Sequence, residues 1–266
     1  MAHKDELIAA LEAHQEAGRW ADAAAACAEL AALEPASAEW AERLGLLQVH
    51  LAATAAGDAG LPEALEHLAR ALSIDPTRRL AREVRANLLV LMSHRLEDNE
   101  LMAFAMRDFL QLEATQPNAT PEQLGRWRLE AARAAFLSLR NKGEERPDYS
   151  LALELFGRVE DAQHEASDWF FRGIAALESG RPTDDPAKFR LAAACFLRAV
   201  EEGGFEREAR YFAADALLSL EAPTQEEFRQ AEFLVGELDA FPQRDFLIDA
   251  LGERLALRRR LLPQQE

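Results

Sequence analysis

One spacing of apolar residues recurs along the chain and restricts the folds open to it. Ala64, Leu68, Ala71 and Pro76 follow one another as a small residue, a large residue, a small residue and a helix terminator. At these spacings the first three share one helix face. A helical repeat of about 34 residues cannot bury that face alone, so neighbouring repeats must stack. The same frame recurs as Ala23, Cys27, Leu30 and Pro35, and again as Ala105, Phe109, Leu112 and Pro117.

The composition favours helix throughout. Alanine and leucine dominate the apolar residues, and β-branched residues are few. Alanine and leucine are strong helix formers, whereas glycine and proline interrupt helices. The glycines and prolines are sparse and fall where helices would end. We therefore predict an all-α protein.

The repeated segments resemble the tetratricopeptide repeat (TPR) family. Leu44-Gly45 stands on a first helix, Gly57 near the turn, and Ala64 and Pro76 on and after a second helix, as in that family's motif. The resemblance covers nearly the whole chain. It implies a right-handed α-solenoid of about six helix hairpins, with a concave groove that binds peptides.

The chain can be divided at its helix terminators and start signals. We expect a helical repeat array over residues 1–243, and a C-terminal capping helix with a short tail over residues 244–266. Two polar connections, 141–148 and 179–186, are longer than the family pattern. They are either contacts for a partner or tolerated surface insertions. The expected units are about 4–37, 38–76, 77–117, 120–162, 165–203 and 205–242.

Charge and cysteine usage exclude several classes of partner and compartment. The formal net charge of −17 opposes binding to nucleic acid. No stretch approaches the ~20 apolar residues of a membrane span, so no membrane partner is expected. Cys27 and Cys195 occupy slots for buried residues, which favours a reducing compartment. We expect a cytoplasmic protein, and the arginine-rich, lysine-poor composition suits a bacterium.

The sequence offers no pattern typical of catalysis. It has no glycine-rich phosphate loop, no paired-cysteine metal spacing and no nucleophile elbow. His164-Glu165 is not followed by the second histidine of a zinc-binding helix. We therefore predict a protein that is not an enzyme, with no catalytic residue, no metal and no cofactor.

If the first helix of each unit lines the groove, helical phase selects the residues that face it. Arginines then stand near one rim of the groove, above an apolar floor. They either bind a partner peptide with acidic groups through bidentate contacts, or balance acidic neighbours on adjacent helices. The candidate partner-binding residues are Arg79, Arg82, Arg128, Phe170, Ile174, Arg207, Arg210 and Leu217.

The main functional prediction is a non-enzymatic scaffold or adaptor. It would bind a partner protein or peptide in its groove or by its extended connections. One alternative is a regulatory sensor that binds a small ligand or signalling peptide. Another is an accessory subunit of an enzyme complex.

Overall fold

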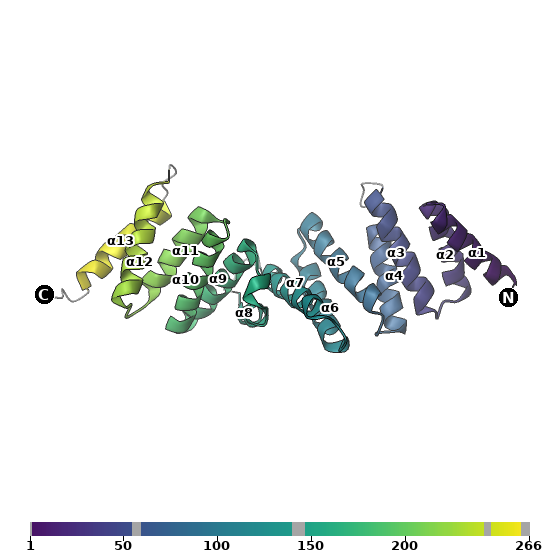
Figure 1. The fold of residues 1–266 in the computed structure, drawn as a ribbon, viewed down its shortest axis with the longest axis horizontal. Helices are drawn as coiled ribbons and strands as arrows, with labels where there is room; N and C mark the ends of the chain where they lie inside the picture. The colour runs from purple at the N-terminus through teal and green to yellow at the C-terminus, as the bar shows by residue number, and fades with distance from the viewer. Residues whose placement is uncertain (1, 55–59, 140–146, 242–245, 262–266) are drawn as a thin grey trace. The chain divides into compact units, whose positions relative to one another are not determined.

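The structure is a computed structural model, and it describes residues 2–54, 60–139, 147–241 and 246–261. Across these residues it contains thirteen α-helices, two short 3₁₀ helices and no strand (Figure 1). The prediction of an all-α fold is confirmed. The α-helices are α1 (Ala2–Glu16), α2 (Trp20–Leu33), α3 (Ala38–Thr54), α4 (Leu61–Ile74), α5 (Arg79–Leu96), α6 (Asn99–Thr115), α7 (Pro121–Leu139), α8 (Ser150–Gly157), α9 (Ala166–Gly180), α10 (Pro186–Glu201), α11 (Glu206–Ser219), α12 (Gln225–Asp239) and α13 (Phe246–Leu261).

The chain divides into two compact units, residues 1–127 and residues 128–266, and α7 contributes to both. In unit 1, α1 packs on α2, α3 on α4 and α5 on α6. In unit 2, α8 packs on α9, α9 on α10, α11 on α12, and α13 on both α11 and α12. First helices of successive pairs also touch, namely α3 with α5, α9 with α11 and α11 with α13. Each unit is therefore a stack of helix hairpins.

Small residues on first helices admit large residues from their partner helices. A Cβ at Gly45 would lie 2.8 Å from Leu68 Cγ, and a Cβ at Gly173 would lie 2.7 Å from the Phe196 ring. Real Cβ atoms do not approach other atoms so closely, so only glycine permits these contacts. Unit 2 has a further pairing of this kind, in which a Cβ at Gly180 of α9 would lie 3.1 Å from the Phe189 ring on α10.

The residues of the recurring frame form the buried seams of these hairpins. Ala64, Leu68 and Ala71 have no exposed surface. The two echoes of the frame are equally buried, with exposures of 0–1% at Ala23, Cys27, Leu30, Ala105, Phe109 and Leu112. Helical phase alone therefore identified the packed face correctly.

The helix starts follow from local capping chemistry. Thr120 and Gln123 form the capping box predicted from sequence, in which the Gln123 N–H donates to Thr120 Oγ1 and the Thr120 N–H donates to Gln123 Oε1. Thr224 and Glu227 form a second box at the start of α12. Each box satisfies N–H groups that have no partner within the helix.

The predicted long connection at 179–186 is wrong, because most of it is helical. Helix α9 continues to Gly180, and the 3₁₀ helix η2 (Arg181–Thr183) adds another turn. Asp185 then caps α10 by accepting from the Ala187 N–H at 2.9 Å. The other predicted connection, 141–148, falls mostly outside the described residues.

Helix α13 is the predicted C-terminal helix. Its Ile248, Leu251 and Leu255 are buried in the core of unit 2. Its other side is not covered, because Phe246 is 77% exposed and Leu257 58% exposed. The boundary between an array ending at residue 243 and a separate capping segment remains a prediction.

Candidate interaction surface

The eight predicted groove residues divide between the two units. Arg79 and Arg82 lie on α5 in unit 1. The other six lie in unit 2: Arg128, Phe170, Ile174, Arg207, Arg210 and Leu217. Each set must therefore be judged from the contacts of its own unit.

Arg82 joins the two helices of its own hairpin. The residue is 9% exposed, and its guanidinium donates to Asp108 Oδ1 at 3.2 Å and to the Pro76 carbonyl at 2.7 Å. Arg85 donates to the same carboxylate at 2.6 and 2.7 Å. A guanidinium buried in this way cannot offer a bidentate face to a partner. For Arg82 the structure favours the alternative interpretation, a charge balanced by an acidic neighbour.

Arg79 is more exposed but is also held by its own unit. Its guanidinium lies 3.7 Å from the Glu83 carboxylate and 5.4 Å from the centroid of the Trp127 ring. Its side chain keeps 42% of its surface exposed. Arg79 can therefore reach a partner only by sharing its charge with these two neighbours.

The predicted residues of unit 2 differ in accessibility. Arg210 is largely covered, and it pairs with Glu237 at 3.1 Å and with Glu206 at 3.6 Å. Leu217 is 3% exposed and belongs to the core, so it is not available to a partner. The remaining four, Phe170, Ile174, Arg128 and Arg207, are half-buried, and both arginines interact with other groups of the chain.

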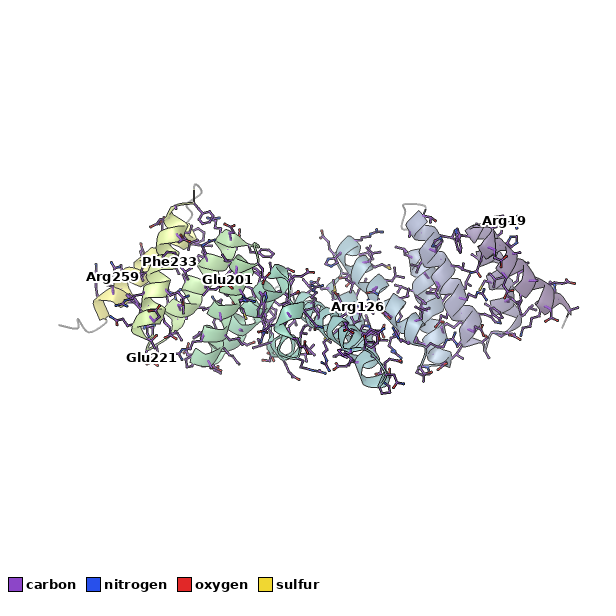
Figure 2. The ribbon with its side chains drawn as sticks, viewed as in Figure 1. Arg19, Arg126, Glu201, Glu221, Phe233 and Arg259 are labelled. Carbon is purple, nitrogen blue, oxygen red and sulfur yellow. The ribbon has the colours of Figure 1, made fainter. Side chains whose placement is uncertain are left out.

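Many arginines of this chain form ion pairs with a carboxylate on a neighbouring hairpin. The partners of these ion pairs are separated by about one repeat length along the sequence. Arg78 pairs with Glu42 at a separation of 36 residues, Arg133 with Asp168 at 35, and Arg181 with Asp215 at 34. Three further pairs have larger separations along the sequence. They are Arg190 with Glu227, Arg254 with Asp215, and Arg126 with Glu83 (Arg126 is labelled in Figure 2).

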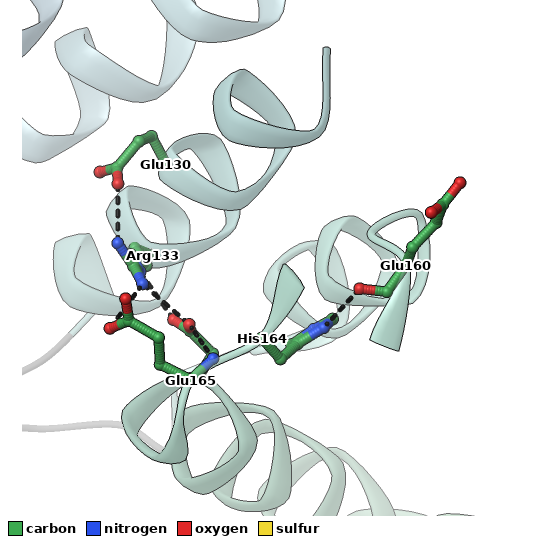
Figure 3. A network of polar contacts seen from close by, with 6 residues as sticks. Glu130, Arg133, Glu160, His164 and Glu165 are labelled. Carbon is green, nitrogen blue, oxygen red and sulfur yellow. Dashed lines mark hydrogen bonds and ion pairs between the residues drawn. The ribbon is translucent and has the colours of Figure 1, made fainter. Parts of the chain in front are cut away.

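The pair of Arg133 with Asp168 is the most buried of these ion pairs (Figure 3). Asp168 has no exposed surface, and both of its oxygens accept from Arg133, at 2.6 and 2.8 Å. Arg133 also donates to Glu130 at 2.7 Å. These carboxylates, Asp168 first, raise the pKa of Arg133. The charged network holds the start of α9 against α7, within unit 2.

An aromatic cluster covers part of α9 and α11 in unit 2. Phe170 stacks on Phe205 with ring centroids 4.4 Å apart, and its edge meets Phe212 at 5.9 Å. Tyr211 lies against Phe212 at 5.2 Å. Phe205 is 42% exposed and adopts a positive φ of 54°, an unfavourable angle for a residue with a large side chain. The cluster therefore keeps aromatic surface accessible beside the predicted residue Phe170.

A pocket of about 220 Å³ adjoins this cluster, between α11, the end of α12 and the start of α13. Tyr211, Phe212 and Leu238 form its apolar wall, together with Leu247 and Ile248 from α13. Arg207, one of the predicted groove residues, lines it as well. We call the surface formed by Phe170, Ile174, Phe205, Tyr211 and Leu247 the α9–α11–α13 face.

Helical phase placed Phe170, Ile174 and Arg207 on or beside this face. It missed Tyr211 and Leu247, which contribute the apolar wall of the pocket. Tyr211 follows Arg210 directly and Leu247 begins the C-terminal helix. An apolar residue at the start of the C-terminal helix was the signal that could have identified Leu247, whereas no sequence pattern distinguishes Tyr211.

Burial shifts the pKa of both cysteines and of His164. Burial raises the pKa of both cysteine thiols, Cys27 and Cys195, to about 11, so neither is a nucleophile at neutral pH. His164 stacks on Trp169 at 4.6 Å, and burial lowers its pKa. Among the described residues no group of three or more His, Cys, Asp or Glu side chains could hold a metal ion.

No family model matches the chain, and no curated protein matches it in sequence. Solved structures do match it. One is the TPR domain of P58(IPK), with 16% identity and a TM-score of 0.38, covering 97% of this chain and 66% of the other. A second is a TPR protein from Parabacteroides merdae ATCC 43184, with 17% identity and a TM-score of 0.38, covering 96% and 100%. Each unit has the stacked helix hairpins that the sequence predicts.

Proposed function

We propose that the chain is a non-enzymatic scaffold that binds a segment of a partner protein on the α9–α11–α13 face. The observation that carries the proposal is the apolar pocket beside an exposed aromatic cluster. Monomeric proteins rarely keep contiguous apolar surface exposed unless it contacts something. Stacked hairpins provide an extended, rigid surface suited to a peptide segment.

The size of the pocket favours a side chain of a peptide over a small ligand. Pockets that enclose a whole small molecule usually measure ~300–1,000 Å³. The volume of about 220 Å³ at this site is smaller. It therefore suits one large apolar side chain, which at this site favours a peptide over a whole small ligand.

The proposal includes a reducing compartment, which we take to be a bacterial cytoplasm. Cys27 and Cys195 are free and buried. Buried thiols of raised pKa need no disulfide partner and resist oxidation. In addition, no helix within the described residues is long and apolar enough to cross a bilayer.

A displayed library of random 12-residue peptides tests the proposal. The full chain, immobilised at pH 7, should enrich peptides that share one large apolar residue. Leu247→Glu places a carboxylate on the wall of the pocket and should weaken the selected peptides by at least tenfold in a fluorescence polarisation assay. Buried apolar contact of one large side chain supports a loss of this order.

Phe233→Glu is the matched control. Phe233 lies on α12, is 62% exposed and does not line the pocket (Figure 2). The Phe233→Glu variant also replaces an apolar side chain with an acidic one. It should bind the selected peptides with the same affinities as the unmodified chain. Failure to enrich any peptide, or an equal loss with both variants, would refute the proposed site.

A further inference from the structure

A second pocket of unit 2 is lined by arginines. It measures about 310 Å³ and lies between the 3₁₀ helix η2, the start of α10, the end of α11 and the second half of α13. Three guanidinium groups line it, those of Arg181, Arg254 and Arg258, with one carboxylate, Asp184. Leu218 and Leu257 add apolar wall. Three of its lining side chains are cationic, although the chain has a net charge of −17.

Two of these arginines are held in place by a buried acid. Asp215 is 5% exposed, and it accepts from Arg181 at 2.8 Å and from Arg254. Arg181 also pairs with Glu178. These ion pairs fix the guanidinium planes before any ligand arrives, which lowers the entropic cost of binding.

Arg258 differs from the other two arginines, which both pair with Asp215. Its Nη1 donates to the Glu221 carbonyl at 3.0 Å, and among the described residues it forms no ion pair with a carboxylate. A guanidinium carries five N–H donors, so most of those of Arg258 remain for a ligand. An anion with two or more oxygens is the natural acceptor for such a fork.

The arginine pocket and the apolar pocket lie along the same helix seam. Tyr211 lines the apolar pocket and Leu218 the arginine pocket, seven residues further along α11. Leu247 and Arg254 repeat this separation on α13. Seven residues bring a helix back to nearly the same side after a rise of about 10 Å.

We propose that the arginine pocket is an oxyanion subsite, which takes a carboxylate or phosphoryl group on the same partner segment whose apolar side chain fills the first pocket. The proposal rests on the proposed function and deepens it by naming the chemistry of the partner. An extended segment advances about 3.3 Å per residue, so the anionic residue should stand about three positions from the apolar anchor.

The peptide selection described above also tests this subsite. Peptides enriched on the unmodified chain should carry Asp or Glu about three positions from the apolar residue. The best peptide is then synthesised with Glu, Gln or phosphoserine at that position, and its affinity is measured by fluorescence polarisation. The Glu form should bind about 5- to 20-fold more tightly than the Gln form, as expected for a charge-assisted contact. A phosphoserine form that binds more tightly than the Glu form would identify a phosphoryl group as the better ligand.

Arg258→Gln is the decisive variant, and Arg259→Gln is its control. Both remove one positive charge from neighbouring positions of α13, but Arg259 pairs with Glu232 on α12 and does not line the pocket (Figure 2). Arg258→Gln should abolish the preference for Glu over Gln, whereas Arg259→Gln should preserve it.

The two proposals fail in different ways. Neutral peptides that bind with no preference for an acidic residue, or a preference that survives Arg258→Gln, would overturn the oxyanion subsite alone. Leu247→Glu should weaken the Glu and Gln peptides alike, because it acts on the apolar anchor. If no peptide binds the unmodified chain, both proposals are overturned.

Discussion

The buried carboxylate of Asp108 should be essential to the stability of unit 1. Asp108 is 2% exposed, and it accepts one hydrogen bond from Arg82 and two from Arg85. Asp108→Asn keeps the shape of the side chain but removes its charge. The guanidinium of Arg82, only 11% exposed, would then face a neutral amide.

The expected loss is about 3 kcal/mol in the free energy of unfolding. Removing one partner of a buried ion pair costs about 3–5 kcal/mol, because the other charge stays buried without compensation. The lower end applies here for two reasons. Arg82 keeps its hydrogen bond to the Pro76 carbonyl. The side chain of Arg85 is 25% exposed and can turn toward water.

Urea unfolding followed by tryptophan fluorescence measures this loss. Three of the four tryptophans lie in unit 1, so Trp169→Phe confines the signal to that unit. Glu66→Gln is the control, because it removes one negative charge at an exposed position of the same unit. A free energy of unfolding for Asp108→Asn within ~0.5 kcal/mol of that of the control would refute the requirement for a buried ion pair.

Three further outcomes follow from packing and titration. Gly173→Ala should destabilise unit 2 by ~1–2 kcal/mol in urea unfolding, because the added methyl group meets an aromatic ring, whereas Gly252→Ala meets nothing and should be neutral or stabilising. The hydrogen bond from Arg190 lowers the pKa of Glu227 to about 2, so its stabilising contribution should be complete above about pH 4.5 and disappear as the pH falls toward 2. Glu227→Gln should flatten the dependence of the urea midpoint on pH in that window, and an unchanged slope would contradict the assignment. Iodoacetamide at pH 8 should not label Cys195 in the native chain, because burial raises its pKa to about 11, and mass spectrometry should find full labelling only in denaturant.

The fold was largely predictable because burial on a helix depends on spacing. Ala64, Leu68 and Ala71 have no exposed surface, as their spacing predicts. The error at 179–186 has a local cause. Proline and glycine in this segment predict a loop, but Pro186 occupies the first turn of α10, where its missing N–H costs nothing.

The interaction surface was less predictable because an arginine's role depends on residues far away in sequence. A spacing of three residues puts Arg79 and Arg82 on one side of α5, but it could not show that Arg82 is buried against Asp108 on the next helix. Likewise, helical phase predicts that Leu217 faces the groove, but its side chain is buried in the core. The exposure of a side chain on a packed helix depends on the helices around it. The helical period of one segment does not predict those contacts.

The ion pairs at repeat-length separations make the hairpins non-interchangeable. Arg133 needs the carboxylate of Asp168, and Arg181 needs that of Asp215, so each hairpin carries one half of a pair whose other half belongs to a specific neighbour. Deleting or duplicating a whole hairpin would place unmatched buried charges at the new junction, at a cost of several kcal/mol. Consensus repeat arrays can be lengthened or shortened at will, but this chain has a fixed order and a fixed length within each unit.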